Sequence, residues 1–236
     1  MAWETNGWQT STAETANATL VQESRRAFMS RVYGWMFAGL WITGMVALFT
    51  VSNESVRNVV INWYFPLVLA ELGLVFVLSM VAPRLSGPVA ALMFIGYSVL
   101  TGLTLSLLFY RYTSGSIAQA FFMTAGAFGA MSLYGTITKK DLSAWASFLF
   151  MGLVGVLIAG VVNIFMGSDM LGFVIACASV IVFAGLTAYQ TQKLREMHAA
   201  TGYSSTATAS IVGALMLYLA FINLFLALLR IFGQRR

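Results

Sequence analysis

Long apolar runs recur along the whole chain, and they restrict its fold more than any other feature of the sequence. A helix of about 20 apolar residues crosses the hydrocarbon core of a bilayer. Backbone groups find no water in lipid, so such runs must be helical, and they lack the alternating pattern of a transmembrane barrel strand. We therefore predict an all-α integral membrane protein, a seven-helix bundle with spans near 32–52, 59–82, 88–110, 116–138, 143–166, 170–190 and 207–229.

The composition supports a surface that faces lipid. Only 9% of the 236 residues are charged, whereas a soluble domain carries roughly 25%. The net charge of +5 comes from basic residues in short segments between the runs, where they anchor helix ends to headgroups, so we expect no nucleic-acid partner. One cysteine, Cys177, and one histidine, His198, leave no ligand set for zinc or copper, and we expect no cofactor.

The chain divides into a short tail and one membrane domain. Residues 1–24 are polar and rich in Thr, Ala and Asn, which predicts a flexible N-terminal tail. Residues 25–236 contain all seven runs and form the membrane domain. In span two, Pro66 is expected to kink the helix.

Basic residues between the runs predict a cytoplasmic N-terminus. In that orientation the cytoplasmic side collects eight of them over the first six spans, and the other side receives Arg57 and Arg111. The last three arginines, Arg230, Arg235 and Arg236, then fall on the outer side, which conflicts with the same rule. The last run, 207–229, is nevertheless long enough for a full crossing, so we keep seven spans.

Small residues at four-residue spacing predict where helices approach one another closely. The third run carries Ser98, Gly102 and Ser106 on one face, and the fourth run carries Ala125 with Gly129. We expect both faces to lie at helix contacts.

One charged residue lies in the middle of a run. Glu71 sits near the centre of the second span, where a charge costs at least a few kcal/mol, so it is a candidate for function. Burial favours the neutral acid unless a cation lies near. A carboxyl group that only bonds neighbouring helices is the alternative, and the sequence leaves both open. The milder polar residues at depth that could join Glu71 along a narrow passage are Asn163, Thr187, Gln190, Tyr218 and Asn223.

Several enzyme classes lack their residues here. No serine–histidine pair lies within the runs, because His198 falls in a predicted loop, and no HExxH or Walker motif occurs. We therefore expect no enzyme.

Five segments form a recognisable set in chain order: VYGWM at 32–36, LTGLTLS at 100–106, GAMSLYG at 129–135, TAYQTQK at 187–193 and LYLAFINLF at 217–225. Together they resemble the Bax inhibitor family, also called the transmembrane Bax inhibitor motif family, and most closely its bacterial inner-membrane branch of YbhL type. The resemblance covers the chain beyond its first two dozen residues.

The resemblance implies a fold and two functions. The fold is a seven-helix bundle with the last helix central, in a bacterial inner membrane. Bacterial members are pH-sensitive calcium leak proteins, and one branch modulates a membrane-bound quality-control protease. In the leak, two aspartates on the last two spans share a proton, since adjacent buried carboxylates cannot both ionise.

This chain departs from the family pattern at both of those aspartates. Gln190 and Ala220 stand in their places, while the family's glutamate in span two is retained as Glu71. The resemblance therefore implies a passive cation leak, with Ca²⁺ only as a passing ion, that lacks its pH gate. The alternative is a non-transporting regulator or partner of a membrane protease. The positions expected along an ion pathway are Glu71, Thr187, Gln190, Tyr218, Ala220 and Asn223.

Overall fold

The computed structural model describes residues 6–81, 84–197 and 206–236, and these residues are almost entirely helical. Seven helical stretches are long and apolar enough to cross a membrane, which confirms the predicted all-α bundle. Within the described ranges the one strand-like feature is an isolated bridge between Tyr112 and Arg235. The helices are α1 (Asn6–Ser52), α2 (Glu54–Asn62), α3 (Tyr64–Val81), α4 (Gly87–Leu105), α5 (Leu108–Arg111), α6 (Ser114–Ile137), α7 (Ser143–Met166), α8 (Asp169–Met197) and α9 (Thr206–Phe232).

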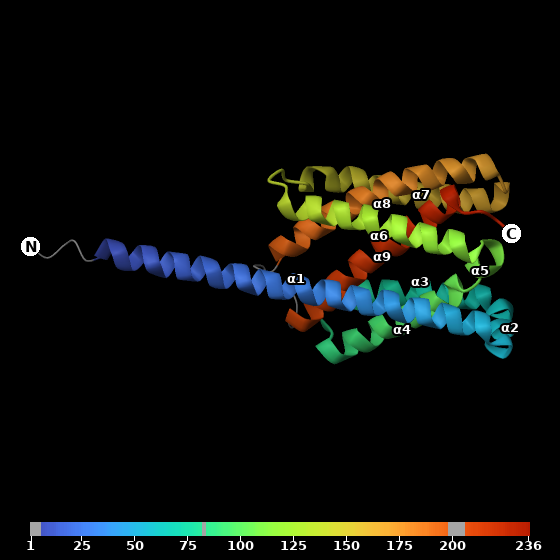
Figure 1. Ribbon diagram of the computed structural model, residues 1–236, viewed down its shortest axis with the longest axis horizontal. Helices are drawn as coiled ribbons and strands as arrows, with labels where there is room; N and C mark the ends of the chain where they lie inside the picture. Colours follow the sequence, from blue (N-terminus) through green and yellow to red (C-terminus); the bar gives the residue numbers. More distant parts are fainter. Residues whose placement is uncertain (1–5, 82–83, 198–205) are drawn as a thin grey trace, which may run out of the picture.

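The first helix is much longer than the span predicted for it. It begins at Asn6 and extends beyond the other helices, so residues 6–24 continue α1 where we expected a flexible tail (Figure 1). A helix that is already nucleated adds residues at little further cost, which outweighs the low helix propensity of the threonines and asparagines in this segment. The apolar, membrane-crossing part is Glu23–Ser52. Residues 1–5 and His198 lie outside the described residues.

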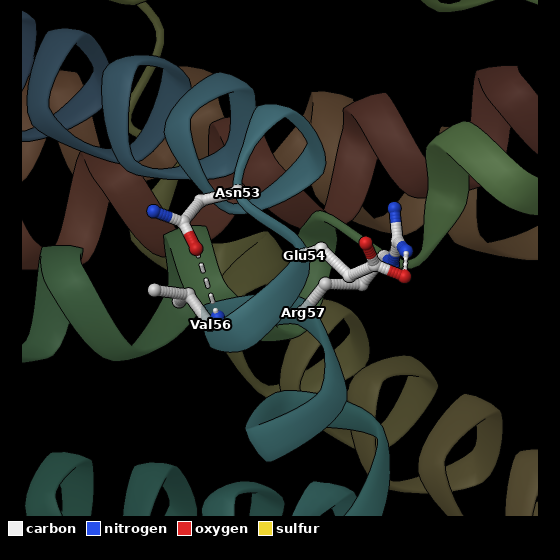
Figure 2. A network of polar contacts seen from close by, with 4 residues as sticks. All are labelled: Asn53, Glu54, Val56 and Arg57. Carbon is white, nitrogen blue, oxygen red and sulfur yellow. Dashed lines mark hydrogen bonds and ion pairs between the residues drawn. The ribbon is translucent and has the colours of Figure 1, made fainter.

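The second predicted span is two helices, α2 and α3. At the start of α2, Asn53 accepts a hydrogen bond from the backbone N–H of Val56 at 3.2 Å, and Glu54 pairs with Arg57 at 3.1 Å (Figure 2). The helix α2 ends at Asn62. In a continuous helix the N–H of residue 66 would bond the carbonyl of Asn62. Pro66 has no N–H to donate, so it begins a new helix in the first turn of α3 instead of kinking one.

The third span is also interrupted, near its end. The backbone N–H of Phe109 bonds the carbonyl of Ser106 at 3.2 Å, and that of Tyr110 bonds Leu107 at 3.2 Å. These i to i+3 bonds replace the helical i to i+4 bonds between α4 and α5 and leave the carbonyl of Leu105 without its usual donor. The remaining spans lie close to their predicted bounds, except that α8 continues to Met197.

The last helix lies in the centre of the bundle, as the resemblance implied. α9 passes between one group formed by α1, α3 and α4 and a second formed by α6, α7 and α8 (Figure 1). Of its most apolar stretch, 72% is buried inside the bundle, against 6% for α3 and 11% for α7. α3 and α7 therefore lie at the periphery, where lipid covers them.

Contacts between loops place the two ends of the bundle. At one end Gln192 of α8 bonds the carbonyl of Lys140 and the N–H of Leu142, both at 2.8 Å. At the other end the C-terminal residues lie against the loop after α5, where the N–H of Arg236 bonds the carbonyl of Arg111 at 3.0 Å. The C-terminal arginines thus lie at the end opposite Lys140, and α9 is a full crossing.

Glycines mark the closest helix contacts, though only one of the two expected faces is used. A Cβ at Gly102 would lie 2.7 Å from the carbonyl oxygen of Thr43, so α4 packs on α1 through the predicted face. In α6 the expected pair, Ala125 and Gly129, is exposed, and a Cβ at Gly129 would meet nothing within 4 Å. The contact to α8 is made instead by Gly135, where a Cβ would overlap the carbonyl oxygen of Ala188.

Gly135→Ala tests this contact. The added methyl group must push α6 away from the backbone of α8, so the free energy of unfolding in detergent micelles should fall by about 1–3 kcal/mol. Gly129→Ala on the same helix is the matched control and should leave stability equal or slightly higher, because alanine favours the helix and the site is open. Equal effects of the two substitutions would contradict the packing described here.

Candidate functional site

A cavity of about 720 Å³ opens between α3 and α7, with α4, α5, α8 and α9 forming its other walls. Four of the six positions expected along an ion pathway line it: Glu71, Gln190, Ala220 and Asn223. The cavity exists because α3 and α7 each pack on one neighbouring span, α4 and α8 respectively. The cavity therefore brings these four residues together on one side of α9.

Glu71 is held by two hydroxyl groups one turn apart on α4. Thr101 Oγ1 lies 2.7 Å from Glu71 Oε1, and Thr104 Oγ1 lies 3.0 Å from Glu71 Oε2. Thr104 Oγ1 is also 3.0 Å from the carbonyl oxygen of Thr101. Each carboxylate oxygen therefore has a partner inside the bundle, which offsets part of the cost of placing an acid at this depth.

The hydrogens in this cluster allow both protonation states of Glu71. A hydroxyl carries one hydrogen, so Thr104 donates either to Glu71 or to the carbonyl of Thr101. An ionised Glu71 accepts from both threonines. A neutral Glu71 accepts from Thr101 and donates its own hydrogen to Thr104, which then donates to the carbonyl. No group in the cluster is left without a partner in either state.

Gln190 and Ala220 line the same cavity but form no polar pair. Among the described residues Gln190 Oε1 is buried and has no hydrogen-bond partner. Ala220 is 2% exposed and presents only a methyl group. The side chain of Asn223 bonds the carbonyl of Leu219 within α9 at 2.8 Å. The buried amide oxygen of Gln190 is therefore unsatisfied beside the methyl group of Ala220.

Tyr218 and Thr187 do not line this cavity. Tyr218 is fully buried, and its hydroxyl oxygen lies 2.6 Å from Thr43 Oγ1. The hydroxyl of Thr43 donates its one hydrogen to the carbonyl of Ser98 at 2.9 Å. Tyr218 is therefore the donor in its bond to Thr43. The ring of Tyr218 packs edge to face on Tyr97, a cavity residue, with centroids 5.8 Å apart. Thr187 is fully buried and bonds the carbonyl of Phe183 in its own helix at 2.8 Å.

The cavity contains residues that were not predicted as site residues. Thr101 and Thr104 belong to the LTGLTLS segment at 100–106, so the segment was noticed but its hydroxyl pair was not connected to Glu71. Arg111 was expected only as a loop residue, yet it lines the cavity. Among the described residues no three His, Cys, Asp or Glu side chains gather where they could hold a metal ion. The oxygen atoms near Glu71 are therefore the chief groups in this cavity that could contact a cation.

A second, apolar cavity of about 400 Å³ lies on the other side of α9, between α1 and α6. Three residues line both cavities and form the wall between them: Leu105, Leu108 and Ile222. The two cavities thus differ in chemistry, and only the one between α3 and α7 contains a carboxylate.

Comparison with known proteins gives the same family as the motifs. The family described as "Inhibitor of apoptosis-promoting Bax1" matches residues 25–236. The chain belongs to this family. It is 48% identical to the inner membrane protein YbhL of Escherichia coli K12, over 89% of this chain and 93% of YbhL. A protein of Deinococcus radiodurans is 49% identical, over 89% of this chain and 91% of its own length.

Family members from distant bacteria are also similar. A protein of Rickettsia prowazekii is 39% identical over 97% of this chain and 98% of its own length. The resemblance of the five motifs is therefore confirmed, and the chain is a multi-pass membrane protein of the Bax inhibitor family.

Gln190→Leu tests the unsatisfied amide. Removing a buried polar group without a partner should leave the free energy of unfolding unchanged or raise it, by up to about 1–3 kcal/mol. Gln192→Leu is the matched control two residues away, because both ends of its amide are bonded, to Leu142 and Lys140. That substitution should lower stability by a similar amount. Chemical unfolding in micelles measures both, and equal destabilisation would contradict the unsatisfied state of Gln190.

Proposed function

We propose that this Bax inhibitor family protein is a passive cation leak, with Ca²⁺ as the ion, whose di-aspartyl pH gate is absent. The observation that carries the proposal is the cavity beside α9, in which Glu71 stands at membrane depth with two hydroxyl groups around it. An ionisable group at this depth is costly and most often serves a pathway for ions or protons.

Oxygen atoms of the right kind surround the proposed path. Ca²⁺ binds carboxylate, hydroxyl and carbonyl oxygens. Glu71, Thr101 and Thr104 supply the first two, and the interruption between α4 and α5 frees the carbonyl of Leu105 beside the same cavity. Irregular backbone at membrane depth is tolerated where it lines a polar cavity, which supports this placement.

The gate differs from the one that the family resemblance implies. Glutamine does not titrate, and alanine offers neither a proton nor an oxygen ligand. Since Gln190 and Ala220 replace both aspartates, no proton-sharing pair exists at these positions to close the path. Glu71 remains the one carboxylate among the described residues that line the cavity.

We place the protein in a bacterial inner membrane with its N-terminus in the cytoplasm. The similarity to an inner membrane protein of Escherichia coli supports this location. The end of the bundle that holds Lys140 also receives most of the basic residues, eight of the 13 in the chain, which favours the cytoplasmic side.

A regulator of a membrane protease is the second candidate. The observation that favours it is the N-terminal part of α1, which extends beyond the bundle as a helix and offers a partner a place to dock (Figure 1). A pure regulator needs no ion path, so the flux experiment below distinguishes the two.

Ca²⁺ flux into liposomes containing the purified protein tests the leak. Glu71→Gln should lower the flux by about tenfold, because it removes the carboxylate that attracts the ion. Glu54→Gln is the matched control: Glu54 is exposed at the start of α2, away from the cavity, and its loss should change flux by less than about twofold.

Three results bear on the proposal. Flux that is lost only in Glu71→Gln supports it. Wild-type liposomes no leakier than empty ones would refute the leak and favour the regulator. Equal flux in wild type and Glu71→Gln would show that ions do not pass by the cavity.

A further inference from the structure

A third cavity lies at the C-terminal ends of α5, α7 and α9, close to the first turn of α8. Its volume is about 420 Å³, and its lining includes Arg111, Asn163, Asp169 and Arg230. Because it sits where three spans end, it lies at the level of lipid headgroups in a bilayer-spanning bundle. The proposed leak makes no use of Asn163 or Arg230.

The charge at this cavity is positive. Arg111 and Arg230 have no ion-pair partner among the described residues. The acidic group that lines it, Asp169, is already paired with Arg235 at 3.0 Å, and this hydrogen bond raises the pKa of Arg235. Two arginines without an ion-pair partner among the described residues therefore line the cavity.

The backbone adds to this positive field. The guanidinium of Arg230 packs on the first turn of α8, where a Cβ at Gly172 would overlap it. The start of a helix carries a partial positive charge, and Asp169, the acidic residue in this turn, already pairs with Arg235, so a further anion near Arg230 is favourable. The packing of Arg230 thus favours a negative group in the cavity.

The buried side chain of Asn163 also indicates that this cavity binds a ligand. It is only 8% exposed, it lines the cavity, and its Oδ1 has no hydrogen-bond partner among the described residues. The amide is a donor through its nitrogen and an acceptor through its oxygen, so either orientation of the group serves a protonated phosphate. Gly160 and Gly167 leave open space beside it along α7, since a Cβ at either would meet nothing within 4 Å.

We propose that this cavity is an anion site that binds a phosphate group, held by Arg111 and Arg230 with Asn163 at its buried side. Arginine matches a phosphate with paired, charge-assisted hydrogen bonds, and two arginines with no other partner suit a group of one or two negative charges. The phosphate belongs either to the headgroup of an anionic lipid or to the free ion. A cation is excluded because the lining side chains already sum to a positive charge.

Native mass spectrometry of the full chain in detergent tests the site with three probes. They are phosphatidylglycerol, inorganic phosphate, and dioleoylglycerol, a lipid that lacks phosphate. The test variant is Arg111→Gln with Arg230→Gln. The matched control is Arg57→Gln with Arg236→Gln, which removes the same charge from the same end of the bundle but leaves the cavity lining and its Asp169–Arg235 pair intact.

The site predicts that wild type binds one phosphatidylglycerol or one phosphate, and that the test variant binds it about tenfold more weakly. The control variant should stay within about twofold of wild type, since distant surface charges contribute little. Asn163→Leu keeps the charge unchanged and should weaken binding several-fold, and its thermal melting shows whether the bundle is still folded. None of these readouts depends on ion flux.

The outcomes separate the sources of the phosphate and also allow the proposal to fail. Phosphatidylglycerol bound without inorganic phosphate identifies a lipid site, and inorganic phosphate that competes with the lipid identifies a site for the group itself. Equal weakening in the test and control variants, equal binding of dioleoylglycerol, or no binding of either phosphate probe would overturn the site.

Discussion

Coverage of α9 by other helices is the constraint on which the rest of the structure depends. In lipid no hydrophobic effect drives helices together, so the bundle is held by close backbone contact and by buried hydrogen bonds. α9 makes both kinds of contact. Gly213 allows the side chains of Leu194 and Val32 to pack closely on α9, and the hydroxyl of Tyr218 forms a hydrogen bond with Thr43 of α1. Two groups of three helices therefore close around it, and α3 and α7 are left at the outside.

This arrangement produces the cavities. Because each group packs on α9 more closely than on the other group, a space remains on either side of the central helix. The apolar side chains around α1 and α6 make one space suited to hydrocarbon, while Glu71 with its two threonines makes the other polar. Arg111 lines both the polar cavity and the cationic cavity of the proposed anion site.

The sequence predicts the bounds of the membrane spans far better than it predicts which face of each helix is buried. α7 was predicted residue for residue as 143–166, because charged and glycine residues bound an uninterrupted apolar run. In α6, however, the glycines at 126 and 129 face outward and the buried side carries Ser116, Thr124 and Ser132. A helix surrounded by lipid is apolar on every side, so composition alone does not distinguish its inner face. The partners of Glu71 depend on how α3 lies against α4, which no local pattern encodes.

The proposed leak conducts cations through a cavity that holds Glu71 but no titrating pair. The most direct measurement compares Ca²⁺ flux through wild type and through Gln190→Asp with Ala220→Asp, in liposomes between about pH 6 and about pH 8. We predict that wild-type flux changes by less than about twofold across this range, while the double variant gains a dependence of about tenfold, because two adjacent carboxylates then share a proton. A steep pH dependence in wild type, or none in the double variant, would refute an ungated leak through this cavity.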